Sequence, residues 1–113
     1  MADLTIQTFK AALDGLSAQQ HAIANNIANA ETPGFIASKV SFESQLADAI
    51  QSGDPTQADV AVSASTDPVN AQGNNVQMDD ENVALINNGL QYQLMVQGLN
   101  SKFSILRTSI NGQ

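Results

Sequence analysis

Apolar side chains recur every three or four positions at both ends of the chain, and the stretch between them is mostly polar. At the front this spacing predicts a long amphipathic helix over about residues 3–29. At the back it predicts a second long helix over about residues 79–109. The front stripe comprises Ile6, Phe9, Leu13, Leu16, Gln20, Ile23, Ile27 and Ala30, and the back stripe Leu85, Tyr92, Val96, Leu99, Phe103, Leu106 and Ile110.

The back helix carries a second apolar edge over its first half, formed by Val83, Ile86, Leu90 and Leu94. One edge can pack against the front helix, which leaves the other for a neighbouring molecule. The acidic residues 79–81 crowd the start of this helix, where the helix dipole favours negative charge.

The front helix has two expected weak points. Gly15 lies in its interior and costs about 1 kcal/mol of helix stability relative to alanine. Asn25, Asn26 and Asn29 are expected to loosen its last turns, and Pro33 with Gly34 ends the pattern.

The middle of the chain is predicted to hold little regular structure. Residues 41–50 fit a short helix that Ser41 would cap. Residues 58–63 alternate as in a short strand, and the rest is predicted as loop. Long structureless loops are uncommon in self-contained domains, so this middle is expected either to be disordered or to be ordered by a partner, and ordering by neighbours is favoured. We also expect it to bury neither terminal stripe.

These elements predict one domain of mainly α fold, with the terminal helices packed as a coiled-coil-like pair. Its parts are an N-terminal helix (1–30), a turn with a short helix (31–50), a polar loop (51–77) and a C-terminal helix (78–113).

Composition narrows the possible functions. The chain has 113 residues, enough for one small domain with a thin core, because four Phe and one Tyr are its only aromatic residues. It has no cysteine, so disulfides and thiolate metal sites are excluded. The net charge of −7 disfavours nucleic acid and anionic membranes, since both need a basic face.

No catalytic, cofactor-binding or metal-ligating set emerges, and no small-molecule substrate is expected. His21 is the only histidine, and its position just off the apolar stripe fits a solvated helix residue. The carboxylates at 79–81 fit a helix start better than a cation site, since no Asp-rich calcium loop surrounds them. The glycines are spread singly and form no phosphate loop.

The start of the chain does not match a secretory signal. Asp3 stands where a basic region is expected, and no apolar run follows it. We therefore expect any export to use a route without a cleaved leader.

The sharpest local pattern is residues 24–35, Ala-Asn-Asn-Ile-Ala-Asn-Ala-Glu-Thr-Pro-Gly-Phe. From the conformational preferences of its residues, this segment is predicted to be a helix end followed by a turn. As a string it resembles the N-terminal signature of the bacterial flagellar basal body rod protein family. The residues that match and are expected to redirect the chain are Asn25, Asn26, Asn29, Thr32, Pro33, Gly34 and Phe35.

The resemblance extends to three further stretches, residues 42–46, 73–81 and 88–93, which are similar to the proximal rod members of that family. The middle of the chain matches nothing, and its shortness argues against relatives with an inserted β-rich domain. A second kind of proximal rod protein shares the front signature, but its back end differs.

The resemblance implies a structural subunit of the flagellar basal body, exported by the type III apparatus and assembled in the periplasm. It implies as partners copies of the same chain, other rod proteins, the export gate and the membrane-ring or adaptor components. Torque would pass through packed helices. The expected assembly interface is Leu13, Leu16, Ile23, Ile27, Tyr92, Val96, Leu99, Phe103 and Leu106.

Two other classes of protein fit the same patterns. One is a different helical rod or adaptor protein of a type III system, which would not assemble with rod subunits. The other is a small cytoplasmic helical binding module, which would already be strongly helical and cooperatively folded as a monomer. An enzyme is a distant third.

Overall fold

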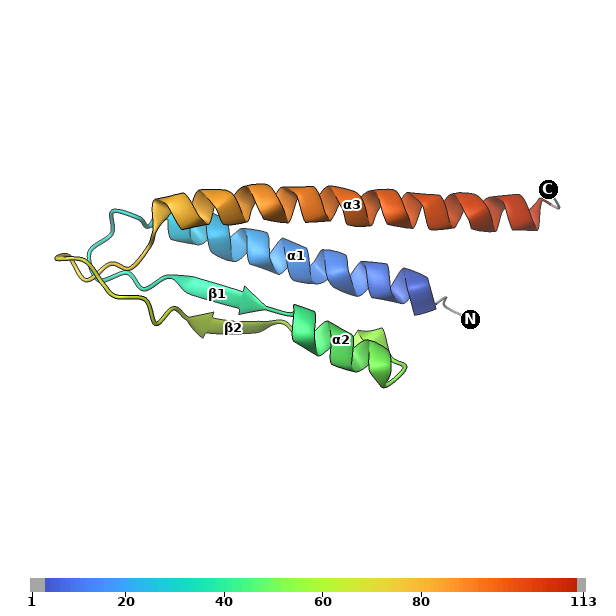
Figure 1. Ribbon diagram of the computed structural model, residues 1–113, viewed down its shortest axis with the longest axis horizontal. Helices are drawn as coiled ribbons and strands as arrows, with labels where there is room; N and C mark the ends of the chain where they lie inside the picture. Colours follow the sequence, from blue (N-terminus) through green and yellow to red (C-terminus); the bar gives the residue numbers. More distant parts are fainter. Residues whose placement is uncertain (1–3, 112–113) are drawn as a thin grey trace.

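The structure is a computed structural model that describes residues 4–111, and it is an elongated molecule of about 65 × 26 × 14 Å (Figure 1). Two long helices pack together, as predicted. Its elements, in chain order, are α1 (Leu4–Ala28), β1 (Ser38–Ser41), α2 (Glu43–Gln51), the 3₁₀ turn η1 (Pro55–Gln57), β2 (Ala61–Ala64) and α3 (Met78–Ile110).

The two long helices run antiparallel, and α3 projects beyond the start of α1 (Figure 1). Leu16 and Ile23 of α1 are buried, with 2% and 6% of their surface exposed. Farther along, the ring of Phe9 lies over Gly98 of α3, where an added Cβ would come within 2.7 Å of the ring. A large side chain thus faces a glycine at this point of the contact.

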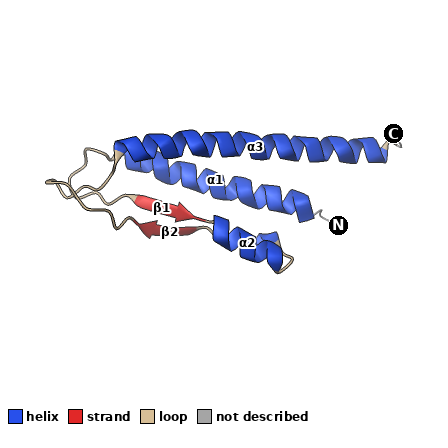
Figure 2. Ribbon diagram, viewed as in Figure 1, coloured by secondary structure: helices blue, strands red, loops and turns tan. Residues whose placement is uncertain are grey.

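The middle of the chain folds back along α1, so the expectation that it could bury neither stripe is wrong. The hairpin β1–β2 and helix α2 lie on the side of α1 away from α3 (Figure 2). Phe42 is the anchor, with 5% of its surface exposed. Its ring occupies the space that a Cβ on Gly15 would need. Gly15 is therefore a close-approach site, which its helix propensity alone does not reveal.

The short elements differ from their predicted bounds. Ser41 ends β1 and does not cap α2, which begins at Glu43 after Phe42 without a side-chain cap. The predicted strand at 58–63 is shifted to β2, and its partner β1 was not predicted. The strands pair antiparallel, with Ser38 opposite Ala64. Four-residue strands are hard to predict because pairing with a partner, and not local pattern, stabilises them.

Within residues 4–111, no helix combines the length and the apolarity that crossing a bilayer requires.

Candidate assembly interface

The signature segment forms a tight, hydrogen-bonded exit from α1. The Asn29 side-chain amide donates to the Asn25 backbone carbonyl at 2.9 Å, and the Thr32 hydroxyl donates to the Asn29 side-chain oxygen at 3.1 Å. Gly34 has a φ of +74°, a left-handed conformation that favours glycine. These bonds tighten the last turn, so the expectation that the asparagines loosen it is wrong: the Asn29 amide bonds locally to Asn25.

Asn74 closes the open end of α1 from far along the chain. Its side-chain amide donates to the backbone carbonyls of Asn29 and Thr32, each at 2.9 Å. Asn74 has 2% of its surface exposed. Carbonyls at a helix end need such partners because the helix itself leaves them unpaired. Asn74 thereby joins the signature turn to the entry of α3.

Asn75 connects three segments that lie outside the helices and strands. Its side-chain oxygen accepts from the Ala37 backbone N–H at 2.7 Å, and its amide donates to the carbonyls of Ser65 and Asp67 at 3.3 and 3.1 Å. With 4% of its surface exposed, it replaces backbone pairing that a longer sheet would have supplied. The polar middle is thus ordered within the described chain itself, by buried amides together with the buried ring of Phe42.

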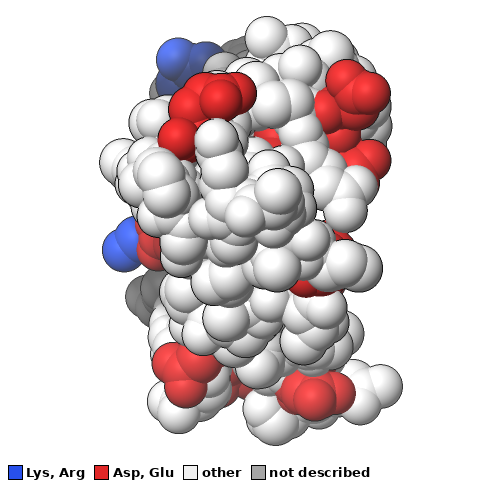
Figure 3. All heavy atoms as spheres, turned by 90° about the vertical axis from the view of Figure 1, so that its left-hand side faces the viewer, with Lys and Arg blue, Asp and Glu red and all other residues white. Residues whose placement is uncertain are grey.

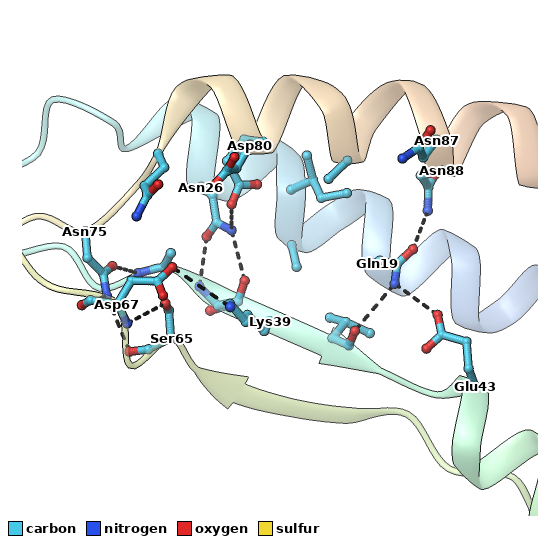
Figure 4. A pocket seen from close by; sticks show the side chains of 18 of the residues that line it. Gln19, Asn26, Lys39, Glu43, Ser65, Asp67, Asn75, Asp80, Asn87 and Asn88 are labelled. Carbon is cyan, nitrogen blue, oxygen red and sulfur yellow. Dashed lines mark hydrogen bonds and ion pairs between the residues drawn. The ribbon is translucent and has the colours of Figure 1, made fainter.

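Asn26 links all three layers of the molecule (Figure 4). Its amide donates to the Ser38 carbonyl at 2.9 Å and to Glu81 Oε1 at 3.0 Å, and its oxygen accepts from the Ser38 N–H at 2.9 Å. Burial raises the pKa of the Glu81 carboxyl; the Asn26 bond and Lys39 oppose this rise, while nearby Asp80 adds to it. Helix α1, strand β1 and the start of α3 are held by this one side chain.

Asn88 plays the same part farther along α3. Its amide donates to the Leu16 carbonyl at 2.8 Å and to the Gln19 side-chain oxygen at 3.1 Å. The Gln19 amide reaches on towards Glu43 at 3.4 Å (Figure 4). With 2% of its surface exposed, Asn88 stands where the back stripe has a gap between Leu85 and Tyr92. A polar residue buried in such a seam fixes the register of two helices.

Sequence reasoning identified Asn26 only as part of a turn. It did not predict that Asn74, Asn75 and Asn88 connect distant segments. The available signal was positional. Asn88 interrupts an apolar stripe on the inner face, and an asparagine there is buried with its bonds satisfied. For Asn74 and Asn75 no local signal exists, because the residues of the front segment to which they bond lie more than 30 positions away in the sequence.

The expected interface residues are brought into one seam to different degrees. Leu16 and Ile23 are buried between α1 and its neighbours. Tyr92 and Phe103 keep 38% and 46% of their surface exposed. The others are half-buried, namely Leu13, Ile27, Val96, Leu99 and Leu106. Of the signature residues, Asn26 is buried, Asn29 and Phe35 are half-buried, and Asn25, Thr32, Pro33 and Gly34 are exposed.

The second apolar edge of α3 faces solvent. Val83, Ile86, Leu90 and Leu94 each expose 56–64% of their surface. We call these four residues the outer stripe. Several large aliphatic side chains in a row on one helix mark an interaction surface more often than single exposed ones. The pairing of α1 with α3 therefore satisfies only one of the two predicted edges.

A polar groove of about 390 Å³ lies between α1, β1 and the first half of α3 (Figure 4). Asparagine and glutamine amides line much of it, together with Lys39, Asp67 and Glu81. Lys39 forms a loose ion pair with Asp67 at 3.9 Å. Among residues 4–111, no group of His, Asp and Glu side chains is placed to hold a metal ion. Helix α3 does begin with its acidic residues in the first turn, and His21 is exposed, as predicted.

Known proteins are similar to this chain over much of its length. Residues 6–35 match the family described as "Flagella basal body rod protein". The chain is 37% identical over 121 residues to "Flagellar basal body rod protein FlgB" of Bacillus subtilis (strain 168), covering 96% of this chain and 94% of that protein. It is 34% identical over 105 residues to the protein of the same name from Borreliella burgdorferi, covering 74% of this chain and 78% of the relative.

A third relative is more distant. The protein of the same name from Escherichia coli (strain K12) is 31% identical over 121 residues, covering 88% of each chain. The similarity thus spans both long helices and the middle, and is not confined to the signature. The chain belongs to the FlgB family of flagellar basal body rod proteins.

Proposed function

We propose that the chain is a structural subunit of the proximal part of the flagellar rod, where it assembles by helix packing into an axial tube that transmits torque. A relative named as a flagellar basal body rod protein is similar to this chain over nearly its whole length. Four of the five buried polar residues in the described part of the chain are asparagines, whose amides hold distant segments in place. A rigid connecting part suits a subunit whose task is to carry load.

The observation that carries this proposal is the exposed outer stripe of α3. A helix that already packs against α1 still presents Val83, Ile86, Leu90 and Leu94 to solvent. Burying a side chain of this size gains about 1.5–3 kcal/mol. Contact with a neighbouring subunit would supply that burial, and repeated contacts along a tube would share an applied torque.

The finer parts of the proposal concern place and partners. We place the subunit in the periplasm, next to the export gate and the membrane-ring or adaptor components, reached by type III export without a cleaved leader. The family signature in residues 24–35 supports this placement. Copies of the same chain and other rod proteins are the proposed neighbours, and the predicted seam residues are the proposed contacts.

The experiment that tests this function adds a charge to the outer stripe. Leu90 is 56% exposed, so Leu90→Asp should leave the isolated chain folded, as judged by circular dichroism. In the assembly the same carboxylate would be buried without a partner, which costs several kcal/mol. We expect cells with this variant as their only copy to lose rods and motility, measured by electron microscopy of isolated basal bodies.

The matched control is Gln93→Asp, which adds the same charge to an exposed polar position of the same helix. It should retain rods. If purified basal bodies lacked the parent chain altogether, or if Leu90→Asp built normal motile rods, the proposed function through this surface would be wrong.

A further inference from the structure

The last part of α3, residues 103–110, reaches beyond the described part of its partner helix; we call it the tail. Phe9 lies over Gly98, and α1 is described from Leu4 onward, so in an antiparallel pair α1 runs alongside α3 to about residue 103. Some seven residues, roughly 10 Å of helix, extend farther (Figure 1). Phe103, Ile105 and Ile110 expose 46%, 61% and 83% of their surface there.

The tail is also the basic part of an acidic protein. After Glu81 the sequence contains no Asp or Glu, and Lys102 and Arg107 are the only charged residues over the remaining 32 positions. Arg107 is exposed on the last turn of the helix. An apolar helix end with positive charge and no carboxylate fits a surface that is apolar and negative.

The opposite end of the molecule has that character. Here the signature turn, the loop before α3 and the first turn of α3 meet, and we call this the loop end. Carboxylates are spread over it in Figure 3. Exposed aliphatic side chains lie among them, with Ile36 at 40% and Val69 at 51%. Its charged residues are Glu31, Asp67, Asp79, Asp80 and Glu81, against the single cation Lys39.

We infer that the tail of one subunit docks on the loop end of a second copy of the same chain. This inference rests on the proposed function and names one contact within it. Exposed aliphatic side chains of the two ends bury one another, and Arg107 lies among the carboxylates of the loop end. Two different surfaces meet, so the contact is heterologous: it keeps all copies pointing the same way and repeats without closing.

The test uses the absence of cysteine from the sequence, which leaves engineered thiols as the only ones on this chain. One copy carries Ile110→Cys and a second copy carries Val69→Cys, and both are expressed in the same cells. Basal bodies are isolated and mildly oxidised. We expect a crosslinked dimer of this chain when both variants are present and none when either is present alone, because a heterologous contact never brings two identical positions together.

Matched variants make the test specific. Gln20→Cys, exposed on the middle of α1, should give no dimer with Ile110→Cys. Arg107→Glu in the Ile110→Cys copy should lower the dimer yield several-fold, and Arg107→Lys should preserve it, since the contact needs the charge.

The outcomes separate this inference from the proposed function. If the chain is present in basal bodies but the mixed pair gives no dimer, or links instead to a protein of another mass, the tail-to-loop-end contact is overturned and the rod function stands. If the chain is absent from basal bodies, the rod function fails and this inference fails with it.

Discussion

At the scale of single residues, this protein depends on side chains that serve as connectors. Asn26, Asn74, Asn75 and Asn88 are all buried, and each is hydrogen-bonded to a segment distant in sequence. A buried amide left without partners would cost about 1–3 kcal/mol, so these residues specify one arrangement as well as stabilising it. Glycines act differently: Gly15 and Gly98 leave room for a neighbouring aromatic ring with which any side chain would collide.

Gly15 offers a direct test of that part. A Cβ at this position would overlap the buried ring of Phe42, so Gly15→Ala should destabilise the chain by about 1–3 kcal/mol despite the better helix propensity of alanine. Gly89→Ala is the control, because nothing lies within 4 Å of its Cβ, and it should stabilise α3 by up to about 1 kcal/mol. Urea unfolding of the purified variants measures both. Equal effects at the two sites would contradict the packing of Phe42.

Glu81 predicts a dependence on pH. Burial raises its pKa, so the folded chain binds this proton more tightly than the unfolded chain does. Its contribution to the free energy of unfolding is therefore largest below the ordinary value of 4.5 and declines as pH rises through the raised value. Glu81→Gln keeps an oxygen that can accept from Asn26 and removes the titration. The advantage of the variant over the parent should grow from about pH 4 upward and then level off.

Urea midpoints at several pH values measure that difference. Asp79→Asn, in the same helical turn and exposed, controls for removing a negative charge from the helix start. A difference between Glu81→Gln and the parent that stays constant across the pH range would contradict the assignment to Glu81.

At the scale of elements, α1 is the central helix and α3 the outward one. Helix α1 is covered by α3 on one side and by β1, α2 and Phe42 on the other. Helix α3 is covered on one side only, and large aliphatic side chains of its outer stripe and its tail face solvent. The two helices were predicted to within two residues at their described ends, because 3.6-residue periodicity over seven or more turns is a strong signal. The short strands depend on each other for their stability, so their sequence signal is weak.

Leu99 tests the pairing of these two helices. It lies half-buried in the predicted seam, close to Gly98 where Phe9 packs. Leu99→Asp places a carboxylate in this apolar contact and should cost several kcal/mol, which lowers helical content and abolishes rod assembly together. Ser101→Asp adds the same charge at an exposed position and should do neither. Circular dichroism and basal body isolation give the two readouts, and a Leu99→Asp chain that still built torque-bearing rods would show that the seam is elsewhere.

At the scale of the whole molecule, the chain is more extended than a compact domain of the same length. Its radius of gyration is 17.7 Å, whereas a compact domain of this length has about 13 Å. Its accessible surface is 7298 Å², against roughly 5,900 Å² for a compact monomer of the same mass. Part of this surface is apolar, because large aliphatic side chains along α3 face solvent. This shape suits a part that reaches its final burial among neighbours, and the opposite charges of its two ends provide a direction for stacking.

The sequence by itself determined the two long helices, the exit turn after the first, the second apolar edge of α3 and the likeness to flagellar rod proteins. Each of these is written in local periodicity or in an unbroken string of residues. Only the tertiary structure decided that the middle covers α1, that Phe42 fills the space beside Gly15, and that four asparagines join segments distant in the sequence. Those features join residues that lie far apart in the chain, and a contact over such a distance leaves no repeating local pattern by which it could be recognised.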